Sequence, residues 1–423
     1  MISKVRGTQD ILPSRFTDKP DAQIERWLLV ERVAREAFRR YGFSEIRTPI
    51  VERAELFERG VGAETDVNKE MYTFEDKDGE RVALRPESTA SVVRAYVEHG
   101  MSGQAGLTKL FYIGPQFRRE RPQKGRYRQF GQIGAEVLGQ SDDPAIEAEV
   151  IEMLDSYLKM LGIVDTQLLV NSIGDENCRP AYIARLKEEI GKRVDHLCSS
   201  CTQRFATNPL RVLDCKVESC QPYLSELPSI TDMLCEPCRV HFEEFRGLLD
   251  DRAIPYTVAP RLVRGLDYYM RTAFEITGGK LGSQNTIVGG GRYDGLSQLI
   301  GGPPAKGFGF ALGVERLVLS LPDDAIDRSA EAPAVFIAYI GDEPRKHSFA
   351  LARRLREAGL SVVVDLEARK LKKSLAVANN LAARYTLIIG DDEIASGSYK
   401  LRNMTSGQEE NLNEPELIRQ LIG

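Results

Sequence analysis

The chain has 423 residues, of which 42% are hydrophobic and 28% are charged, and its formal net charge is −5. At about 150 residues per domain this length predicts two to four domains and excludes a peptide or a single small module. No apolar run approaches the ~18 residues of a membrane helix, and the first residues lack the apolar stretch of a secretory signal. We therefore expect a soluble, cytoplasmic protein that binds no membrane. The weak net charge argues against a histone-like protein and leaves a local nucleic-acid-binding patch open.

The first predicted element is a long amphipathic helix over residues 21–41, where apolar residues recur at helical spacing before a terminating Gly42. Residues 43–50 alternate like a strand, and Pro49 places that strand at an edge or an end of a sheet. Further strand-like runs follow at residues 81–84, 107–113, 130–137, 274–276 and 286–289. Their spacing favours an antiparallel sheet over repeating βαβ units, so we expect an α+β fold for residues 1–325.

Residues 174–251 differ in composition, because they are rich in cysteine and lack strand signals, which predicts a helical insertion. Cys178 stands alone, and the other six cysteines follow in one segment as Cys198, Cys201, Cys215, Cys220, Cys235 and Cys238. In a reducing compartment such clustering favours metal binding over disulfides. Two Cys-x-x-Cys pairs predict a structural Zn²⁺ site made of Cys198, Cys201, Cys235 and Cys238. Cys215 and Cys220 compete as ligands, and buried thiols without metal are the alternative.

A second change of composition marks a linker at residues 326–333, within an acidic, proline-bounded stretch that has no apolar period. Beyond it, short apolar runs at residues 334–340, 361–364 and 385–389 alternate with helical stretches, which predicts a small α/β domain over residues 334–423. Between Arg345 and Arg402 there are twelve Lys or Arg residues and six Asp or Glu residues. This local basicity suits phosphate contacts, although a solvated helix face explains part of it equally well.

Two kinds of segment have the chemistry of a ligand site. Six basic residues surround Glu120 between Arg118 and Arg128, a pattern typical of a solvated hairpin but also of a site for a triphosphate beside a purine edge. Glycine-rich runs follow at residues 287–296 and 307–317, yet neither has the spacing of a Rossmann or P-loop nucleotide site. Taken singly, each run favours a tight turn over a ligand cradle.

Five segments together resemble a known family. Pro49 after the long helix, the hairpin at residues 117–136 and residues 307–317 resemble motifs 1, 2 and 3 of class II aminoacyl-tRNA synthetases. Residues 262–269 and 289–295 resemble the two histidine-specific motifs of the histidyl-tRNA synthetase family, and residues 5–13 are similar to its usual opening. The resemblance runs from about residue 4 to the end. It implies an antiparallel class II catalytic core followed by an anticodon-binding domain, and a homodimer formed through motif 1.

The resemblance also implies ligands and site residues. The ligands are L-histidine, ATP with Mg²⁺ and tRNA(His), with no DNA. The expected ATP-binding residues are Arg118, Glu120, Phe130, Arg264 and Arg316. Of these, Arg118 and Arg264 face the α-phosphate and are the expected catalytic residues. The expected histidine-binding residues are Glu87, Thr89, Gln132, Glu136, Tyr268, Tyr269 and Tyr293. Structural roles for Glu136 and for the tyrosine pair are the alternative.

Two other classes of protein compete with an enzyme. The first is a noncatalytic relative that binds histidine and regulates ATP phosphoribosyltransferase, but such relatives typically lack the anticodon domain and lose ATP-site residues. Here Arg118, Glu120, Arg264 and Arg316 are all present, and so is the terminal domain. The second is a plain RNA-binding protein, which leaves the pocket motifs unexplained. The sequence therefore favours a histidine-activating enzyme of this family.

Overall fold

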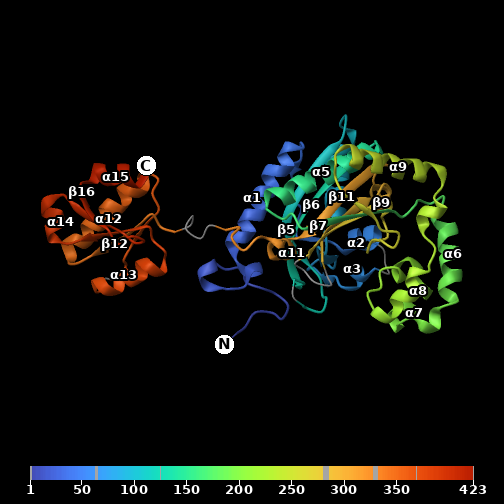
Figure 1. Cartoon of the computed structure of the whole chain (residues 1–423), viewed down its shortest axis with the longest axis horizontal. Coiled ribbons are helices and arrows are strands. Elements are labelled where there is room, and N and C mark those ends of the chain that lie inside the picture. Colours follow the sequence, from blue (N-terminus) through green and yellow to red (C-terminus); the bar gives the residue numbers. More distant parts are fainter. Residues whose placement is uncertain are drawn as a thin grey trace. The chain divides into compact units, whose positions relative to one another are not determined.

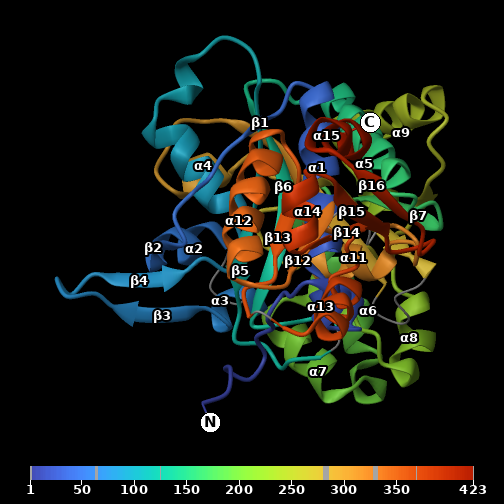
Figure 2. The same cartoon turned by 90° about the vertical axis from the view of Figure 1, so that its left-hand side faces the viewer.

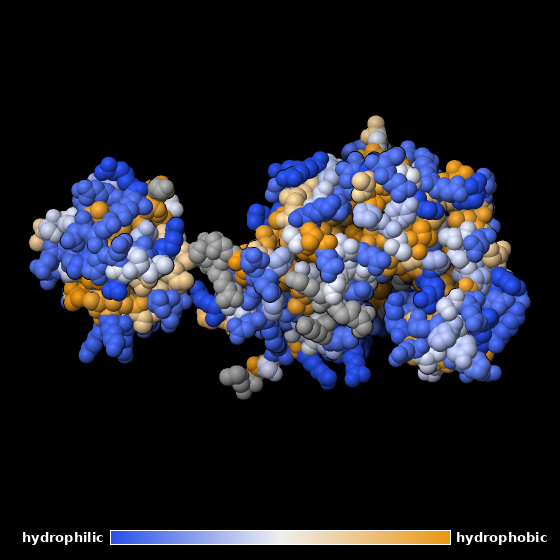
Figure 3. Space-filling model, in the orientation of Figure 1, coloured by the Kyte–Doolittle hydropathy of each residue, from blue (hydrophilic) through white to orange (hydrophobic). Residues whose placement is uncertain are grey.

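The computed structural model of the chain describes residues 2–61, 65–123, 125–279, 285–326, 332–367 and 369–422. The chain divides into two compact units, Met1–Ala325 and Ile326–Gly423, each with its own hydrophobic core (Figure 1). Residues 327–331 of the expected linker lie outside the described residues. Hydrophilic residues predominate on the face drawn in Figure 3, with apolar groups scattered among them. Within the described ranges, no helix has both the length and the apolar character that crossing a membrane requires.

The larger unit is built on an eight-stranded sheet that is antiparallel except for one parallel pair at each edge. In spatial order its strands are β1 (Ser44–Glu45), β5 (Thr108–Phe117), β6 (Gln129–Gly139), β11 (Lys306–Gly313), β10 (Thr286–Arg292), β9 (Met270–Gly278), β7 (Thr166–Ser172) and β8 (Thr257–Val258). The predicted α+β class is therefore confirmed. The strand expected after the first helix is reduced to the two residues of β1 at the edge of the sheet.

One face of this sheet packs against helices through the main core of the unit (Figure 1). These are α1 (Ile24–Arg40), α5 (Pro144–Met160), α9 (Glu236–Asp251) and α11 (Val314–Ser320). The fully buried ring of Phe38 on α1 contacts Phe111, Tyr157 and Phe310 at centroid distances of 5.4, 5.4 and 5.9 Å. Gly42, at φ +80°, follows the end of α1 in the left-handed conformation that terminates many helices, as its sequence position predicted.

The opposite face of the sheet is partly covered by shorter elements (Figure 2). They comprise a small sheet in the order β2 (Val51–Arg53), β4 (Arg81–Leu84) and β3 (Tyr72–Glu75), with helices α2 (Ala54–Val61), α3 (Asp66–Lys69), α4 (Thr89–Glu98) and α10 (Leu296–Leu299). Val92, Val93 and Tyr96 on α4 share a buried cluster with Tyr112 of β5. This side of the sheet is therefore only partly filled, and it is where the predicted ligand-binding residues lie.

The chain between β7 and β8 forms the helical insertion and ends with α9. Its first helices are α6 (Arg179–Gly191), α7 (Ser199–Thr207) and α8 (Gln221–Ser225). Short 3-10 helices join them at η4 (Val194–His196), η5 (Pro209–Val212), η6 (Glu218–Cys220) and η7 (Ile230–Met233). The insertion has a separate small core in which Tyr182, Leu186 and Ile190 of α6 pack against cysteines and leucines of the following segments. As predicted, the described residues of this segment form helices and no strand.

The smaller unit contains a five-stranded sheet flanked by helices. Its strands, in spatial order, are β13 (Val362–Val364), β12 (Val335–Tyr339), β14 (Tyr385–Ile389), β15 (Tyr399–Asn403) and β16 (Glu409–Leu412). Its helices are α12 (Asp342–Glu357), α13 (Leu371–Asn380), α14 (Asp391–Ser396) and α15 (Glu414–Ile422). The three parallel strands carry the apolar runs seen in the sequence, whereas β15 and β16 were not predicted, because they are antiparallel, largely polar strands at one side of the sheet.

Candidate active site

The floor of the candidate site is a set of glycines on neighbouring strands of the large sheet. They are Gly114, Gly134, Gly289, Gly291, Gly307 and Gly309. A Cβ atom on Gly309 would lie 2.6 Å from the Ala135 carbonyl oxygen and 2.7 Å from the carboxyl carbon of Glu136. The two glycine-rich runs are thus largely strand segments, and neighbouring side chains lie across them. The expectation of tight turns is wrong, because the pairing of both strands holds these glycines in the sheet.

Two buried carboxyl groups stand on this floor. Thr89 Oγ1 donates a hydrogen bond to Glu136 Oε1 at 2.7 Å, and the Tyr293 hydroxyl donates to Glu136 Oε2. Burial away from water raises the pKa of Glu136 to about 8. Glu87 lies at the N-terminus of α4, where its oxygens accept the backbone N–H groups of Thr89 at 2.6 Å and Ala90 at 3.0 Å. Burial raises the pKa of Glu87 as well, so both carboxyl groups lie in a part of the site shielded from water.

Aromatic side chains form one wall of the same pocket. The ring centroids of Tyr268, Tyr269 and Tyr293 lie 4.7 to 6.4 Å apart in tilted and edge-on pairs. Tyr112, which no sequence motif indicated, is buried beside them and its hydroxyl donates to Gln132 Oε1 at 3.4 Å. The structure therefore brings together the seven residues that the sequence pointed to for histidine. Its new member, Tyr112, is an aromatic residue within an apolar strand, which carries no distinguishing signal.

Arginine side chains border the pocket at the hairpin between β5 and β6. Arg118 donates from Nε to the Pro86 carbonyl at 2.9 Å, and its guanidinium carbon lies 5.2 Å from the ring centroid of Phe130. Burial lowers the pKa of Arg118. Glu120 forms an ion pair with Arg126 at 3.4 Å. Three of the predicted ATP-site residues therefore lie on this hairpin.

The other two arginines approach from separate segments. Arg264 Nη1 donates to Glu275 Oε1 at 2.6 Å, and its guanidinium carbon lies 5.5 Å from the Tyr269 ring centroid. Its Nε is buried without a hydrogen-bond partner among the described residues. Glu275 Oε2 accepts from Thr286 Oγ1 at 3.0 Å, and Arg316 Nη1 donates to the Thr286 carbonyl at 2.9 Å. Thr286 thus connects the neighbourhoods of the two arginines.

Two charged groups of the site region were missed, one of them partly buried and the other fully buried. Glu275 orients Arg264, and the only sequence signal for it is that it is the sole acid in β9. Arg292 is fully buried, where it donates to Glu147 Oε1 at 2.6 Å and to Asp294 Oδ1 at 3.1 Å. His241 of α9 also lies 2.9 Å from Glu147 Oε1. This network joins α5 and α9 to the strand that ends beside Tyr293.

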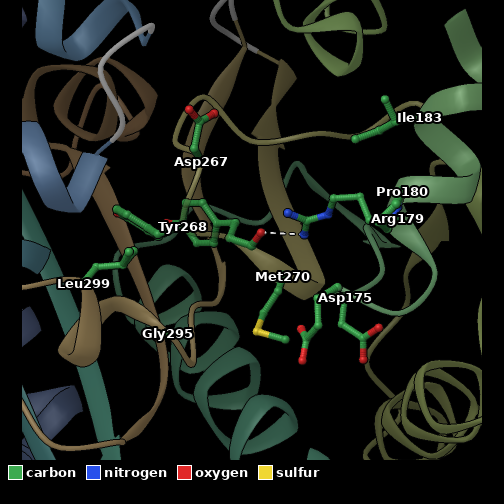
Figure 4. A pocket seen from close by; sticks show the side chains of 11 residues that line it. Asp175, Arg179, Pro180, Ile183, Asp267, Tyr268, Met270, Gly295 and Leu299 are labelled. Carbon is green, nitrogen blue, oxygen red and sulfur yellow. Dashed lines mark hydrogen bonds between the residues drawn. The ribbon is translucent and has the colours of Figure 1, made fainter.

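A cavity of about 270 Å³ adjoins the tyrosine pair on the side of the insertion. Figure 4 shows Arg179 of α6 reaching from the insertion towards the backbone beside Tyr268. Arg179 Nη2 donates to the carbonyl oxygens of Tyr269 at 2.7 Å and Gly174 at 3.1 Å, and Nε donates to that of Ile173 at 3.1 Å. The first helix of the insertion is therefore fastened to the segment that carries the tyrosine wall.

The structure corrects the expected set of zinc ligands. Cys198 and Cys201 lie in one cluster with Cys215 and Cys220. Cys235 and Cys238 lie in a second cluster with Asp175 and Cys178. The predicted site of Cys198, Cys201, Cys235 and Cys238 is wrong, because α9 begins beside the end of β7 and carries its Cys-x-x-Cys pair there.

Comparisons with known proteins agree along the whole chain. A family model described as histidyl-tRNA synthetase matches residues 15–317, and one described as an anticodon binding domain matches residues 334–422. A histidine–tRNA ligase of Solibacter usitatus is 53% identical over 423 residues, covering 100% of this chain and 99% of the relative. That of Koribacter versatilis is 48% identical and covers 99% and 95%. The crystal structure of apo S. aureus histidyl-tRNA synthetase is 36% identical, with a TM-score of 0.81 and full coverage of both chains.

Proposed function

The chain belongs to the histidyl-tRNA synthetase family and joins histidine to tRNA with the use of ATP, and we propose that the pocket above the glycine floor is where histidine is activated. In the first step the histidine carboxylate attacks the α-phosphorus of ATP, and pyrophosphate leaves. In the second, the histidyl group passes to the terminal ribose of tRNA(His), and AMP is released. The observation that carries the proposal is the buried Glu136, held by Thr89 and Tyr293 close to a group of arginines.

We propose that Glu136 recognises the imidazole ring. A carboxyl group whose pKa is about 8 keeps its proton in the free protein at neutral pH, so it offers a donor to the unprotonated ring nitrogen. Tyr268, Tyr269 and Tyr293 would enclose the ring, and a competitor without ring nitrogens would leave buried polar groups unpaired. Glu87, Thr89 and Gln132 would hold the α-ammonium, because they supply a carboxylate and neutral acceptors.

The arginines would hold the triphosphate. Attack on the α-phosphorus needs positioning and charge neutralisation more than proton transfer. Arg118 and Arg264 would flank the α-phosphate and Arg316 the γ-phosphate, while Glu120 would accept the adenine amine and Phe130 would stack on the adenine. Mg²⁺ would neutralise the departing pyrophosphate. The support from the structure is that Arg264 is already oriented by Glu275 and keeps its buried Nε available.

Two macromolecular partners, tRNA(His) and a second copy of the chain, would bind outside the pocket. Residues 334–423 would bind the anticodon of tRNA(His), with exposed Lys370, Lys372 and Lys373 near the start of α13 as phosphate contacts. A second copy of the chain would bind at motif 1. The support for a homodimer is that two adjacent apolar residues directly after Pro49, Ile50 and Val51, are 42% and 47% exposed.

The test is histidine-dependent exchange of pyrophosphate into ATP by the purified full-length protein. Exchange that requires histidine and is lost when Glu136 is replaced by alanine supports the proposal. A protein that binds histidine without exchange is a regulatory relative, and one that binds RNA without binding histidine is an RNA-binding protein. Either result would overturn the proposed activity.

A further inference from the structure

We propose that the insertion contains a structural tetrathiolate zinc site formed by Cys198, Cys201, Cys215 and Cys220. The four sulfur atoms all lie within 4.8 Å of one another, and none of the four cysteines forms a disulfide. Cys198 is the N-cap of α7 and Cys201 lies in its first turn, while Cys220 ends η6. A Cys-x-x-Cys pair at a helix start facing a second close pair is a common arrangement of structural zinc sites.

The sulfur separations suit zinc rather than a disulfide. Tetrahedral Zn²⁺ with bonds of about 2.3 Å places its sulfur ligands about 3.8 Å apart. The sulfur atoms of Cys198 and Cys215 are 3.9 Å apart, nearly twice the length of about 2.05 Å in a disulfide. Backbone N–H groups point at two of the sulfurs, since Cys198 N lies 3.2 Å from Cys220 Sγ and Val217 N lies 3.4 Å from Cys215 Sγ. Such N–H groups stabilise thiolate ligands.

The second cluster differs in its donors and serves as an internal comparison. It has three cysteines and Asp175, whose Oδ1 accepts the backbone N–H of Asn177 at 3.0 Å. Asp175 Oδ2 also lies 3.7 Å from Nη2 of Arg271. The charge of this carboxylate is therefore already balanced by protein groups. We assign no metal to this cluster, and its Cys235 provides a matched control for the variants described below.

The zinc site would hold the insertion against the loop that carries Arg264. Cys201, Cys215 and Cys220 belong to the small core of the insertion, and Val263 packs against that core. From the segment between the two cysteine pairs, Arg211 Nη1 donates to the Gly265 carbonyl at 3.0 Å. From the same segment, Asn208 Nδ2 donates to Asp267 Oδ1 at 3.3 Å. Both contacts reach residues that closely follow the expected α-phosphate ligand Arg264 in the chain, so the metal would stabilise this loop from outside the pocket.

Elemental analysis and X-ray absorption of the full-length protein, purified without chelator, test the assignment. We expect about one equivalent of zinc with four sulfur neighbours at about 2.3 Å. Cys215→Ser and Cys220→Ser should lose this zinc, whereas Cys235→Ser should retain it. The absorption measurement needs no variant, so it decides the matter even if the serine variants fail to fold.

Three results would overturn the proposal. They are a folded wild-type protein without zinc, loss of the zinc in Cys235→Ser alone, and a sulfur count below four. In the first case, thiol titration of the denatured protein shows whether a disulfide replaces the metal. A separate readout is limited proteolysis, because zinc removal should expose residues 199–225 to cleavage while leaving the proposed histidine pocket uncut. Unchanged protection after complete removal of zinc would contradict a structural role.

Discussion

At Arg264, the contribution of the positive charge to the rate of adenylate formation can be measured separately from the contribution of its position. Arg264→Ala removes one donor from the developing charge on the α-phosphate, which should slow adenylate formation a hundred- to thousandfold, about 3 to 4 kcal/mol. Arg264→Lys should recover part of the rate, since the point charge survives without the planar fork. Histidine affinity should change little, because Arg264 donates its hydrogen bond to Glu275 and not to Glu136. Single-turnover adenylate formation and equilibrium histidine binding measure the two effects.

Gly289→Ala tests position alone. A Cβ at residue 289 would lie 2.7 Å from Nη1 and 2.8 Å from Cζ of Arg264, so the guanidinium has to move by more than half an ångström to reach ordinary contact distance. The charge stays, yet misplacement by about 1 Å can reduce a rate a hundredfold. Gly247→Ala is the matched control, because nothing lies within 4 Å of its added Cβ. Near-normal rates in a folded Arg264→Ala protein would refute the reasoning for this loop.

Three further predictions follow from buried charge and from the two units. Glu136→Gln removes a carboxyl group whose pKa differs between the two states. In the unfolded wild type this carboxyl ionises above pH 4.5, whereas in the folded wild type it keeps its proton to about pH 8. Native stability therefore falls by about 1.4 kcal/mol per pH unit between those values in the wild type alone. In denaturant unfolding, the free energy of unfolding of the variant relative to the wild type should therefore be about 4 kcal/mol higher at pH 8 than at pH 5. A difference that is the same at both pH values would contradict the prediction. Glu147→Gln should destabilise the fold by about 3 kcal/mol in urea, because buried Arg292 loses a partner. Glu149→Gln, which breaks the more exposed ion pair of Glu149 with Lys109, should cost less than about 1 kcal/mol. Deleting residues 334–423 should preserve pyrophosphate exchange while tRNA charging falls, and equal charging by the folded fragment would exclude the anticodon role.

Periodic apolar segments were the most predictable part of the fold. The strands Arg81–Leu84 and Tyr385–Ile389 have the bounds that their sequence patterns indicate. The glycine-rich strands were only partly predictable, because residues 286–289 of β10 were expected as a strand while the rest of β10 and all of β11 were not. Glycine has low strand propensity and carries no hydrophobic period. β10 and β11 form because both of their neighbours pair with them, which is a property of the assembled sheet.

The cysteine pairs show a different limit of sequence reasoning. Spacing identifies Cys198 with Cys201 and Cys235 with Cys238 as two Cys-x-x-Cys pairs that can bind a metal, but it does not say which pairs face each other. That choice depends on how α9 crosses back to α5 and the main core. It could be made only when the path of the chain was known.

The polar residues that orient other side chains were the hardest to find, and the reason is physical. Arg264 and Glu136 belong to motifs, whereas Glu275 and Tyr112 are isolated strand residues outside any motif, a pattern equally typical of satisfied structural residues. Yet Arg264 is held by the Glu275 carboxylate and lies above the bare backbone of Gly289. A guanidinium fixed before ATP arrives needs no reorganisation as charge develops, which is the condition under which electrostatic stabilisation is largest. Glu275→Gln should therefore leave histidine affinity unchanged and slow adenylate formation less than Arg264→Ala does. Equal losses in the two variants would mean that Glu275 does more than orient its partner.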